Sequence, residues 1–352
     1  MFELDFLPVE TTSGTGSKSG DAIAARFTVP SLGREAVLVV DGGYNETGDA
    51  IVKHLADYYD TDHVDLMIST HPDMDHLNGL EVALSQLDVD ELLIHRPGLH
   101  RRNLEGDFSN YAAVKSLLET ASNQGVLVTE PWTGLTRFDG QVAVLGPTRT
   151  YYEQLLDDYL AEVRGKAVSL ASRALTATFG KAKSLLQRAL NSYPPETLTD
   201  DEGDTSHRNN MSVITLIRAD NERLLLTGDA GIPALTQAVD YYENTTVGVF
   251  SNYPLHLFQV PHHGSRRNLG PTLLDRMFGT EFAPFSTTSA CISSAKADEK
   301  HPAPKIVNAL GRRGCRVVAT EGQTICVYGG KSPRPGWGPI QPFPPLDEAD
   351  DD

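Results

Sequence analysis

Short apolar runs, separated by stretches rich in Gly, Ser, Thr and Pro, dominate the start of the chain. Such runs are typical of β-strands, and they predict strands at Glu3–Val9, Ala22–Val29 and Ala36–Val40. A helix is predicted at about Ala50–Tyr59. Strand and helix patterns continue to alternate up to residue 147, which indicates sheet packed against helices.

The segment Tyr151–Asn191 has a different pattern, because its apolar residues are spaced as on a helix. It contains a basic stretch, Arg164–Leu190, with six Lys or Arg and no Asp or Glu. Residues 151–208 are therefore predicted to form a helical, partly basic insertion. Three roles stay open for it: a solvated surface balanced by the acidic body, a lid or nucleic-acid contact over an active site, and a docking surface for a protein partner through residues 151–191.

Strand patterns resume after this insertion, at Val213–Ile217, Leu224–Leu226 and Val247–Phe250. Residues 1–150 and 209–330 are thus predicted to be the first and second halves of one domain. Neither half shows a repeat of the other at the level of sequence.

The composition limits the class of protein. A chain of 352 residues that is 40% apolar can form one large α/β domain with a sizeable core. No run approaches the roughly 20 apolar residues that span a bilayer, and Met1–Asp5 lacks the basic and apolar regions of a secretory leader. A cytoplasmic protein without membrane association is expected. Residues 331–352, rich in Pro and Gly and ending in Asp and Glu, are predicted to form a disordered acidic tail.

The formal net charge of −17 bears on possible partners. It argues against sequence-independent adhesion to nucleic acid, which requires Lys and Arg to meet phosphates. It does not exclude a polyanionic substrate, because bound metal ions would supply local positive charge. The sequence gives no indication of the oligomeric state.

Candidate chemistry is concentrated at residues 71–76, His-Pro-Asp-Met-Asp-His, which follow an apolar run and precede an apolar-periodic segment. Four imidazoles and carboxylates this close would repel or titrate one another unless a cation held them. Two further buried-strand patterns also end in candidate ligands: one ends at Asp229, and the other at His262 and His263. The sequence therefore predicts a metal site where three strands end.

These motifs, taken in order, resemble those of the metallo-β-lactamase-fold superfamily, and within it the hydrolase domain of ComEC/Rec2-type competence proteins. The segments 20–22 (Gly-Asp-Ala), 209–213 (Asn-Asn-Met-Ser-Val) and 301–302 (His-Pro) resemble further signatures of that group. The resemblance implies an α/β (α+β) fold, a four-layer αββα sandwich with a helical insertion. Its active site would lie at the edge between two sheets.

The resemblance also implies two divalent metal ions. Two such ions about 3.5–4 Å apart lower the pKa of a shared water and stabilise both the attacking and the leaving oxygen. The implied ligands are His71 and Asp73 for the first ion, Asp75 and His76 for the second, Asp229 as the bridge, and His262 to complete the second site.

The ligand types bear on the identity of the ions. Asp73 stands where the superfamily commonly has His, and an imidazole expected near residues 207–212 is replaced by the Asn/Ser segment, with Asn210 favoured over His207 for that position. Fewer imidazoles shift the balance from Zn²⁺ toward Mn²⁺ or Mg²⁺. We expect Mn²⁺ or Zn²⁺, with Mg²⁺ as an alternative.

Further roles follow from the same resemblance. Asp75 would hold the second ion and the metal-activated water, and His263 or His301 would protonate the leaving group. Asp41 is expected to orient the ligand loop rather than bind metal. Substrate contacts are expected from Asn210, Ser212, Ser265 and Arg266, with a phosphate clamped by arginine.

The predicted function is a metal-dependent phosphodiesterase or nuclease that acts on DNA or a nucleotide. The substrate class comes from the resemblance, since the residues alone indicate only a hydrolase with two hard divalent ions. Two alternatives stay open. One is a hydrolase of a small molecule such as a nucleotide, phosphonate or lactone; the other is a regulatory subunit that binds a partner through the insertion. The intact ligand set argues against the second.

Overall fold

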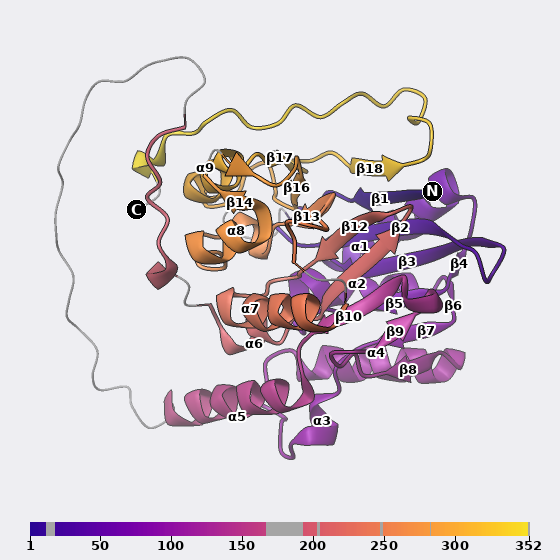
Figure 1. The fold of residues 1–352 in the computed structure, drawn as a ribbon. Helices are drawn as coiled ribbons and strands as arrows, with labels where there is room; N and C mark the ends of the chain where they lie inside the picture. The colour runs from indigo at the N-terminus through magenta and orange to yellow at the C-terminus, as the bar shows by residue number, and fades with distance from the viewer. Residues whose placement is uncertain (12–17, 167–192, 203–204, 247–248, 282, 351–352) are drawn as a thin grey trace.

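Figure 1 shows the computed structural model of the chain. Two seven-stranded sheets lie face to face, and helices cover the outer face of each. This layering is the predicted four-layer αββα sandwich, which is thereby confirmed. The structure describes residues 1–11, 18–166, 193–202, 205–246, 249–281 and 283–350.

The first sheet combines strands from both ends of the chain. Its middle and far strands, β3 to β8, run parallel, whereas β18, β1 and β2 are antiparallel to their neighbours. In spatial order the strands are β18 (Ile325–Gly329), β1 (Phe2–Phe6), β2 (Ala22–Val29), β3 (Arg34–Gly42), β5 (Leu66–Ile68), β7 (Glu91–Leu93) and β8 (Leu127–Thr129).

The second sheet has parallel strands β17, β16, β13 and β12, followed by an antiparallel set. Two of its strands, β10 and β9, precede the insertion in sequence, so the two halves of the chain exchange strands. In spatial order the strands are β17 (Arg316–Ala319), β16 (Ser289–Ile292), β13 (Leu257–Gln259), β12 (Glu222–Leu226), β11 (Ile214–Ala219), β10 (Val142–Gly146) and β9 (Thr136–Arg137).

The main core lies between the sheets because side chains alternate along each strand. In β2, Ile23, Ala25 and Phe27 join the cluster between the sheets, whereas Ala22 and Ala24 face the helices. All five are buried, so both faces of β2 are covered. Burial of apolar area on both faces is the main stabilising contribution expected for such a sandwich.

Three helices pack on each outer face. Those on the first sheet are α1, α2 and α4, and those on the second are α7, α8 and α9. Their bounds are α1 (Asn45–His54, continued by a π-helical turn at Leu55–Tyr59), α2 (Met74–Leu84), α4 (Tyr111–Gln124), α7 (Ile232–Tyr241, with a π-helical turn at Tyr242–Thr246), α8 (Pro271–Phe278) and α9 (Pro304–Arg312).

Short elements complete the described chain. Two pairs of two-residue strands form small separate sheets, and 3₁₀ turns occur within several loops. They are β4 (His63–Val64) with β6 (Asp88–Val89), β14 (Gly279–Thr280) with β15 (Ala283–Pro284), the helices α3 (Pro97–His100) and α6 (His207–Asn210), and the turns Phe138–Gly140, Asp200–Glu202, His262–Gly264 and Glu348–Asp350.

The predicted insertion begins with helix α5 (Arg149–Lys166), as the periodic pattern indicated. Apolar side chains of α5, among them Leu156 and Tyr159, form a separate cluster with Phe108 and Met211. Residues 167–192, which carry most of the predicted basic stretch, lie outside the described residues. The role of that stretch therefore stays a prediction.

Two local predictions differ from the structure. Helix α1 begins at Asn45, five residues before the predicted start at Ala50. A strand was predicted at Val247–Phe250; of these residues the structure describes only 249 and 250, and it places neither in a strand.

Residues 331–350, predicted as a disordered acidic tail, follow a defined course across the edges of both sheets (Figure 1). Nη2 of Arg334 lies 2.7 Å from Oδ2 of Asp5, and the backbone N–H of Phe343 donates to the carbonyl of Val317. In the described residues, no helix is long and apolar enough to cross a membrane.

Candidate metal centre

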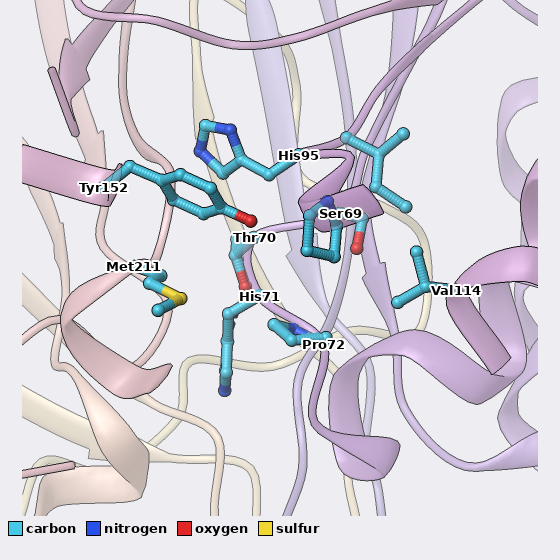
Figure 2. A pocket seen from close by; sticks show the side chains of 10 residues that line it. Ser69, Thr70, His71, Pro72, His95, Val114, Tyr152 and Met211 are labelled. Carbon is cyan, nitrogen blue, oxygen red and sulfur yellow. Dashed lines mark hydrogen bonds between the residues drawn. The ribbon is translucent and has the colours of Figure 1, made fainter. Parts of the chain in front are cut away.

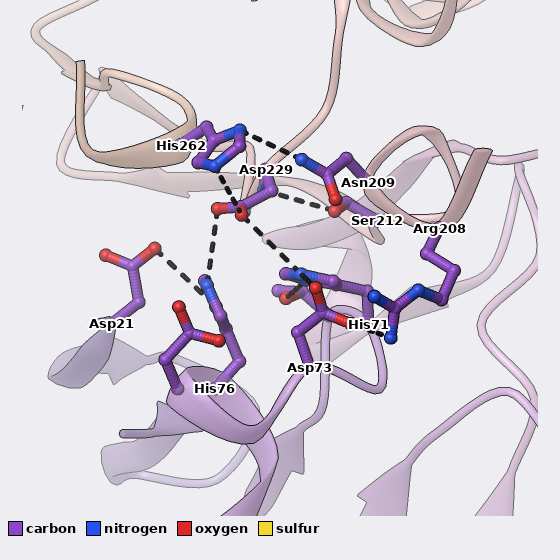
Figure 3. A network of polar contacts seen from close by, with 12 residues as sticks. Asp21, His71, Asp73, His76, Arg208, Asn209, Ser212, Asp229 and His262 are labelled. Carbon is purple, nitrogen blue, oxygen red and sulfur yellow. Dashed lines mark hydrogen bonds and ion pairs between the residues drawn. The ribbon is translucent and has the colours of Figure 1, made fainter. Parts of the chain in front are cut away.

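The candidate ligands follow strands of both sheets and lie in loops or in the first turn of α2. β5 leads into the loop with His71, β12 leads to Asp229, and β13 leads to His262 and His263. Because β5 and β3 are parallel, as are β12 and β13, their carboxyl ends lie at the same edge of each sheet. Figure 3 shows the side chains converging between the two sheets.

Asp229 lies at the centre of the cluster. Its Oδ2 is 3.6 Å from Nε2 of His71 and 3.8 Å from Nε2 of His262. Its Oδ1 is 3.3 Å from Nε2 of His76. The two oxygens of one buried carboxylate therefore face different imidazoles, which is the geometry expected of a bridging ligand.

A second group of ligand atoms forms around His76. Asp75, His76 and His263 each offer one atom within 4.8 Å of the others, and Nε2 of His263 lies 3.6 Å from Oδ2 of Asp75. Nδ1 of His263 lies 2.9 Å from the carbonyl oxygen of Ser293. The resemblance implied His262 for this group, whereas the structure groups His263 with Asp75 and His76. Nε2 of His262 lies near Oδ2 of Asp229, the oxygen that also faces His71.

Several ligand atoms lack hydrogen bonds to one another, and a bound cation would satisfy them. Nε2 of His71, His76 and His263 and Oδ1 of Asp229 are buried and make no hydrogen bond within the described residues. Buried polar atoms without partners are costly, and each such atom needs an explanation. Nitrogen and carboxylate oxygen donors grouped in this way are ligands suited to divalent transition metals.

The opposite edges of the imidazoles are held by supporting side chains. Oδ2 of Asp41 lies 2.8 Å from Nδ1 of His76, and Oδ1 accepts a hydrogen bond from the backbone N–H of Thr70. Oγ1 of Thr70 lies 3.0 Å from Nδ1 of His71. These contacts leave the Nε2 atoms for metal and agree with the predicted orienting role of Asp41.

Asn210 and Ser212, predicted to contact substrate, are buried and turn their polar atoms inward. Oδ1 of Asn210 accepts from the N–H of Gly231, and Oγ of Ser212 accepts from the N–H of Asp229, both at 3.1 Å. Both side chains therefore support the loop of the bridging carboxylate instead of facing a substrate. It is Asn209 that reaches the centre, with Nδ2 2.9 Å from Nδ1 of His262.

Asp73 has a partner that the sequence did not indicate. Its Oδ2 lies 3.9 Å from Nε2 of His71, as a ligand of the first ion would, and its Oδ1 lies 2.6 Å from Nη1 of Arg208. Asp21 was also missed, although its buried carboxylate lies 3.6 Å from Nδ1 of His76. Its place in the Gly-Asp-Ala segment was the only available signal.

The remaining predicted residues lie near the histidine loop. The ring of His301 stacks beside that of His262, with centroids 5.9 Å apart, and Nδ1 of His301 lies 3.1 Å from Oδ2 of Asp298. Oγ of Ser265 accepts a backbone hydrogen bond at 3.3 Å. The guanidinium of Arg266 is partly exposed and makes no hydrogen bond or ion pair with any described residue.

The opposing charges shift the pKa values in the centre. Burial would lower the pKa of His76, but the carboxylate of Asp229 outweighs it, and the pKa lies well above its usual value. Burial likewise opposes the charged form of His263, yet Asp75 raises its pKa to about 9. Burial and the neighbouring His76 lower the pKa of His71 to about 4. The carboxylates thus stabilise positive charge around Asp75, as a cation site requires.

Figure 2 shows a small pocket beside the ligand loop, lined by Thr70, His71, His95 and Tyr152 among others. The ring of His95 contacts those of Trp132 and Tyr152, with centroids 4.5 and 4.4 Å away, and these two rings also contact each other at 5.4 Å. Burial lowers the pKa of His95 to about 3, so this imidazole is neutral. The aromatic stack packs α5, which carries Tyr152, against the loop that holds the first ligand.

The four layers, with ligand loops at the strand ends between them, give the chain the metallo-β-lactamase fold that its motifs predicted. No protein-family model matches the chain. It is 21% identical over 290 residues to ComE operon protein 3 of Bacillus subtilis (strain 168). The match covers 82% of this chain but 27% of that protein, so the chain spans about a quarter of the length of this relative.

Two solved structures match the chain at low similarity. One is a metallo-β-lactamase, described as putative, from Thermotoga maritima: identity is 12%, the TM-score is 0.36, and 70% of this chain and 86% of that one are covered. The other is a mutant of CmlA β-hydroxylase: identity is 12%, the TM-score is 0.41, and 93% of this chain and 53% of that one are covered. The His/Asp clusters among the described residues could hold divalent metal ions.

Proposed function

We propose that the protein is a metal-dependent phosphodiesterase that holds two divalent ions on either side of Asp229. The observation that carries the proposal is the placement of the two Asp229 oxygens, one facing each group of imidazoles. The proposed ligands are His71, Asp73 and His262 for the first ion, and Asp75, His76 and His263 for the second, with Asp229 shared.

This assignment divides the neighbouring histidines between the ions. His263 is buried, and a hydrogen bond from its Nδ1–H to the Ser293 carbonyl would leave Nε2 as the donor atom for a metal. His262 takes the place of the imidazole that the Asn/Ser segment lacks. Four imidazoles with three carboxylates suit Mn²⁺ or Zn²⁺, with Mg²⁺ as an alternative.

When bound, the ions would supply a water of lowered pKa and stabilise the charge of the reacting phosphoryl group. The chain itself positions the ligands through Asp41 and the Ser293 carbonyl. His301 is the imidazole near the centre left for proton transfer, because its Nδ1 contacts Asp298 and its Nε2 is not committed to the ligand groups. We assign it the protonation of the leaving oxygen.

A phosphodiester is the substrate that these residues fit best, with DNA or a nucleotide as the natural form. The resemblance to the ComEC/Rec2-type hydrolase domain supports this class. The free guanidinium of Arg266, one loop residue beyond Ser265, supports it independently, because arginine binds phosphate oxygens through paired N–H groups.

The proposal is tested by hydrolysis of bis-p-nitrophenyl phosphate, a dinucleotide, and single- and double-stranded DNA. Metal-stripped protein is refilled with Mn²⁺, Zn²⁺ or Mg²⁺, and Asp75→Ala is compared with Glu119→Gln, an exposed carboxylate on α4. We expect activity that requires metal, survives in Glu119→Gln and is lost in Asp75→Ala. Stoichiometric metal binding without phosphodiester hydrolysis would contradict the proposal and direct the search to lactones or a regulatory role.

A further inference from the structure

Among the described residues, Arg208 is the one arginine or lysine that pairs with a carboxylate of the metal centre. The other carboxylates there, those of Asp21, Asp41, Asp75 and Asp229, form their ion pairs with histidines. The position of Arg208 needs an explanation, because a permanent positive charge would repel metal ions bound nearby, and the repulsion is strong where the charges are partly buried.

The position of Arg208 is fixed from two sides. Its neighbours on α6 hold the backbone: Oγ of Ser206 accepts the N–H of Asn209 at 3.1 Å. On the side-chain end, the guanidinium carbon lies 5.7 Å from the centre of the Tyr159 ring, and the Tyr159 hydroxyl lies 2.9 Å from Oγ of Ser109. Helix α5 of the insertion thus supports the guanidinium through an aromatic face.

Part of the guanidinium remains available. Nη1 is buried against Oδ1 of Asp73 at 2.6 Å (Figure 3), whereas the Arg208 side chain as a whole is 21% exposed. Nε and Nη2 make no hydrogen bond with the described part of the chain. A guanidinium presents its N–H groups in a planar fork that matches phosphate geometry. Asp73 therefore occupies one side of the fork and leaves the other open.

The charge balance of the metal centre also favours a role for Arg208 in binding an anion. Five carboxylates surround the centre, and two divalent ions would leave it with one net negative charge. Arg208 cancels that charge, so that an approaching phosphodiester anion is not repelled. An arginine that served only to anchor Asp73 would not need open N–H groups.

We propose that Arg208 binds a non-bridging phosphoryl oxygen of the substrate while Asp73 holds the guanidinium in place. The inference rests on the proposed function and names the residue that recognises the phosphoryl group. It also gives helix α5 a role, since the ring of Tyr159 on α5 packs against the guanidinium of Arg208 beside the metal centre.

The test measures the binding of inorganic phosphate to the Mn²⁺-loaded protein by calorimetry, with Mn²⁺ stoichiometry determined in parallel. A lost charge-assisted contact predicts that Arg208→Gln binds phosphate at least about tenfold more weakly, with Mn²⁺ stoichiometry unchanged. Arg208→Lys restores the charge but not the fork and should regain part of the affinity. The matched control is Arg164→Gln on α5, whose arginine pairs with Asp107 at 2.8 Å and is half exposed.

Two results would overturn the inference: equal phosphate affinity in Arg208→Gln and wild type, or loss of Mn²⁺ together with phosphate, which would make Arg208 a positioning residue for Asp73. Measuring phosphodiester hydrolysis alongside phosphate binding distinguishes failure of the Arg208 inference from failure of the proposed function. Phosphodiester turnover with an unchanged KM in Arg208→Gln refutes the inference alone. Phosphate binding that depends on Arg208 without any turnover supports anion recognition and refutes the proposed hydrolysis.

Discussion

Oδ2 of Asp41 lies 2.8 Å from Nδ1 of His76, and both side chains are almost completely buried. This contact favours the tautomer of His76 with the proton on Nδ1. It leaves the lone pair of Nε2, which faces Asp229, for a metal ion. The same carboxylate accepts hydrogen bonds from the N–H and hydroxyl of Thr70, next to the first ligand. One buried carboxylate thus orients ligands on both sides of the proposed dinuclear centre.

Replacing this carboxylate tests its orienting role. Asp41→Asn keeps the shape of the side chain but removes the charge that holds the imidazole, so we expect Mn²⁺ affinity to fall about 10- to 100-fold. Titration calorimetry with metal-stripped protein measures the change. Glu119→Gln should bind as the wild type does, and unchanged affinity in Asp41→Asn would show that the imidazole is held by packing alone.

Gly20 tests the close packing behind the ligand loop. A Cβ at this position would lie 2.5 Å from the carbonyl oxygen of Asp75 and 2.6 Å from a methyl of Val9. We expect Gly20→Ala to lower the free energy of unfolding by about 1–3 kcal/mol and to weaken metal binding. Gly165→Ala on α5, where a Cβ meets nothing within 4 Å, should instead stabilise by about 0.5–1 kcal/mol. Denaturant unfolding compares the two.

Metal removal is expected to destabilise the protein, because ions that bind only the folded state shift the folding equilibrium. At a free metal concentration of 100 times Kd the gain is about 2.7 kcal/mol for one site. Thermal unfolding after chelation and after refilling with Mn²⁺ measures it. Asp75→Ala should respond less than the wild type, and an identical response would place the bound ion elsewhere.

The proposed role of His301 predicts a dependence on the leaving group. His301→Gln should slow hydrolysis of a dinucleotide, whose alkoxide needs a proton, by about 10²- to 10⁴-fold. Hydrolysis of bis-p-nitrophenyl phosphate should change little, because p-nitrophenolate leaves without protonation. Equal losses for both substrates would assign His301 a structural role.

Asp5, on β1, predicts a pH dependence of stability. It is fully buried, and its oxygens lie 3.0 Å from Nε2 of His54 and 2.7 Å from Nη2 of Arg334. Burial would raise its pKa, but these partners outweigh burial and lower the pKa below its usual value of 3.8. The carboxylate therefore contributes stability above pH ~4 that is lost as the pH falls through the folded-state pKa.

The matching experiment compares Asp5→Asn with the wild type by urea unfolding between pH 7 and pH 3. At pH 7 the variant should be less stable by about 1–3 kcal/mol, because the partly buried Arg334 loses one of its two carboxylate partners and keeps only Glu3. The difference should shrink below pH ~4, where the unfolded wild-type chain takes up a proton at Asp5 while the folded carboxylate stays ionised. A difference that stays constant over this range would mean that Asp5 does not titrate with folding.

Local patterns explain what the sequence could predict. β2 begins at Ala22 and ends at Val29, as predicted, because alternation and turn residues are local signals. Which ligand group each of the two neighbouring histidines joins could not be predicted. His262 and His263 both have left-handed backbone, with φ of 50° and 56°, so the alternation of the strand does not extend to them.

Tertiary packing explains the other differences. Helix α1 includes Gly48, a residue of low helix propensity that precedes the predicted start at Ala50. The structure needs glycine there, since a Cβ would lie 2.5 Å from the carbonyl oxygen of Gly79 on α2. The course of residues 331–350 depends on partners such as Asp5 that lie more than 300 positions earlier, which local composition cannot reveal.

The pairing of β18 with β1 has a consequence for biosynthesis. The first sheet joins residues 2–6 to residues 325–329, while β9 and β10, made before the insertion, belong to the second sheet. A nascent chain therefore cannot complete either sheet until its last strands leave the ribosome. Such long-range pairing slows folding and leaves strand edges open for aggregation in the meantime. The protein should therefore depend on chaperones during synthesis, and fragments that end before β18 should not fold on their own.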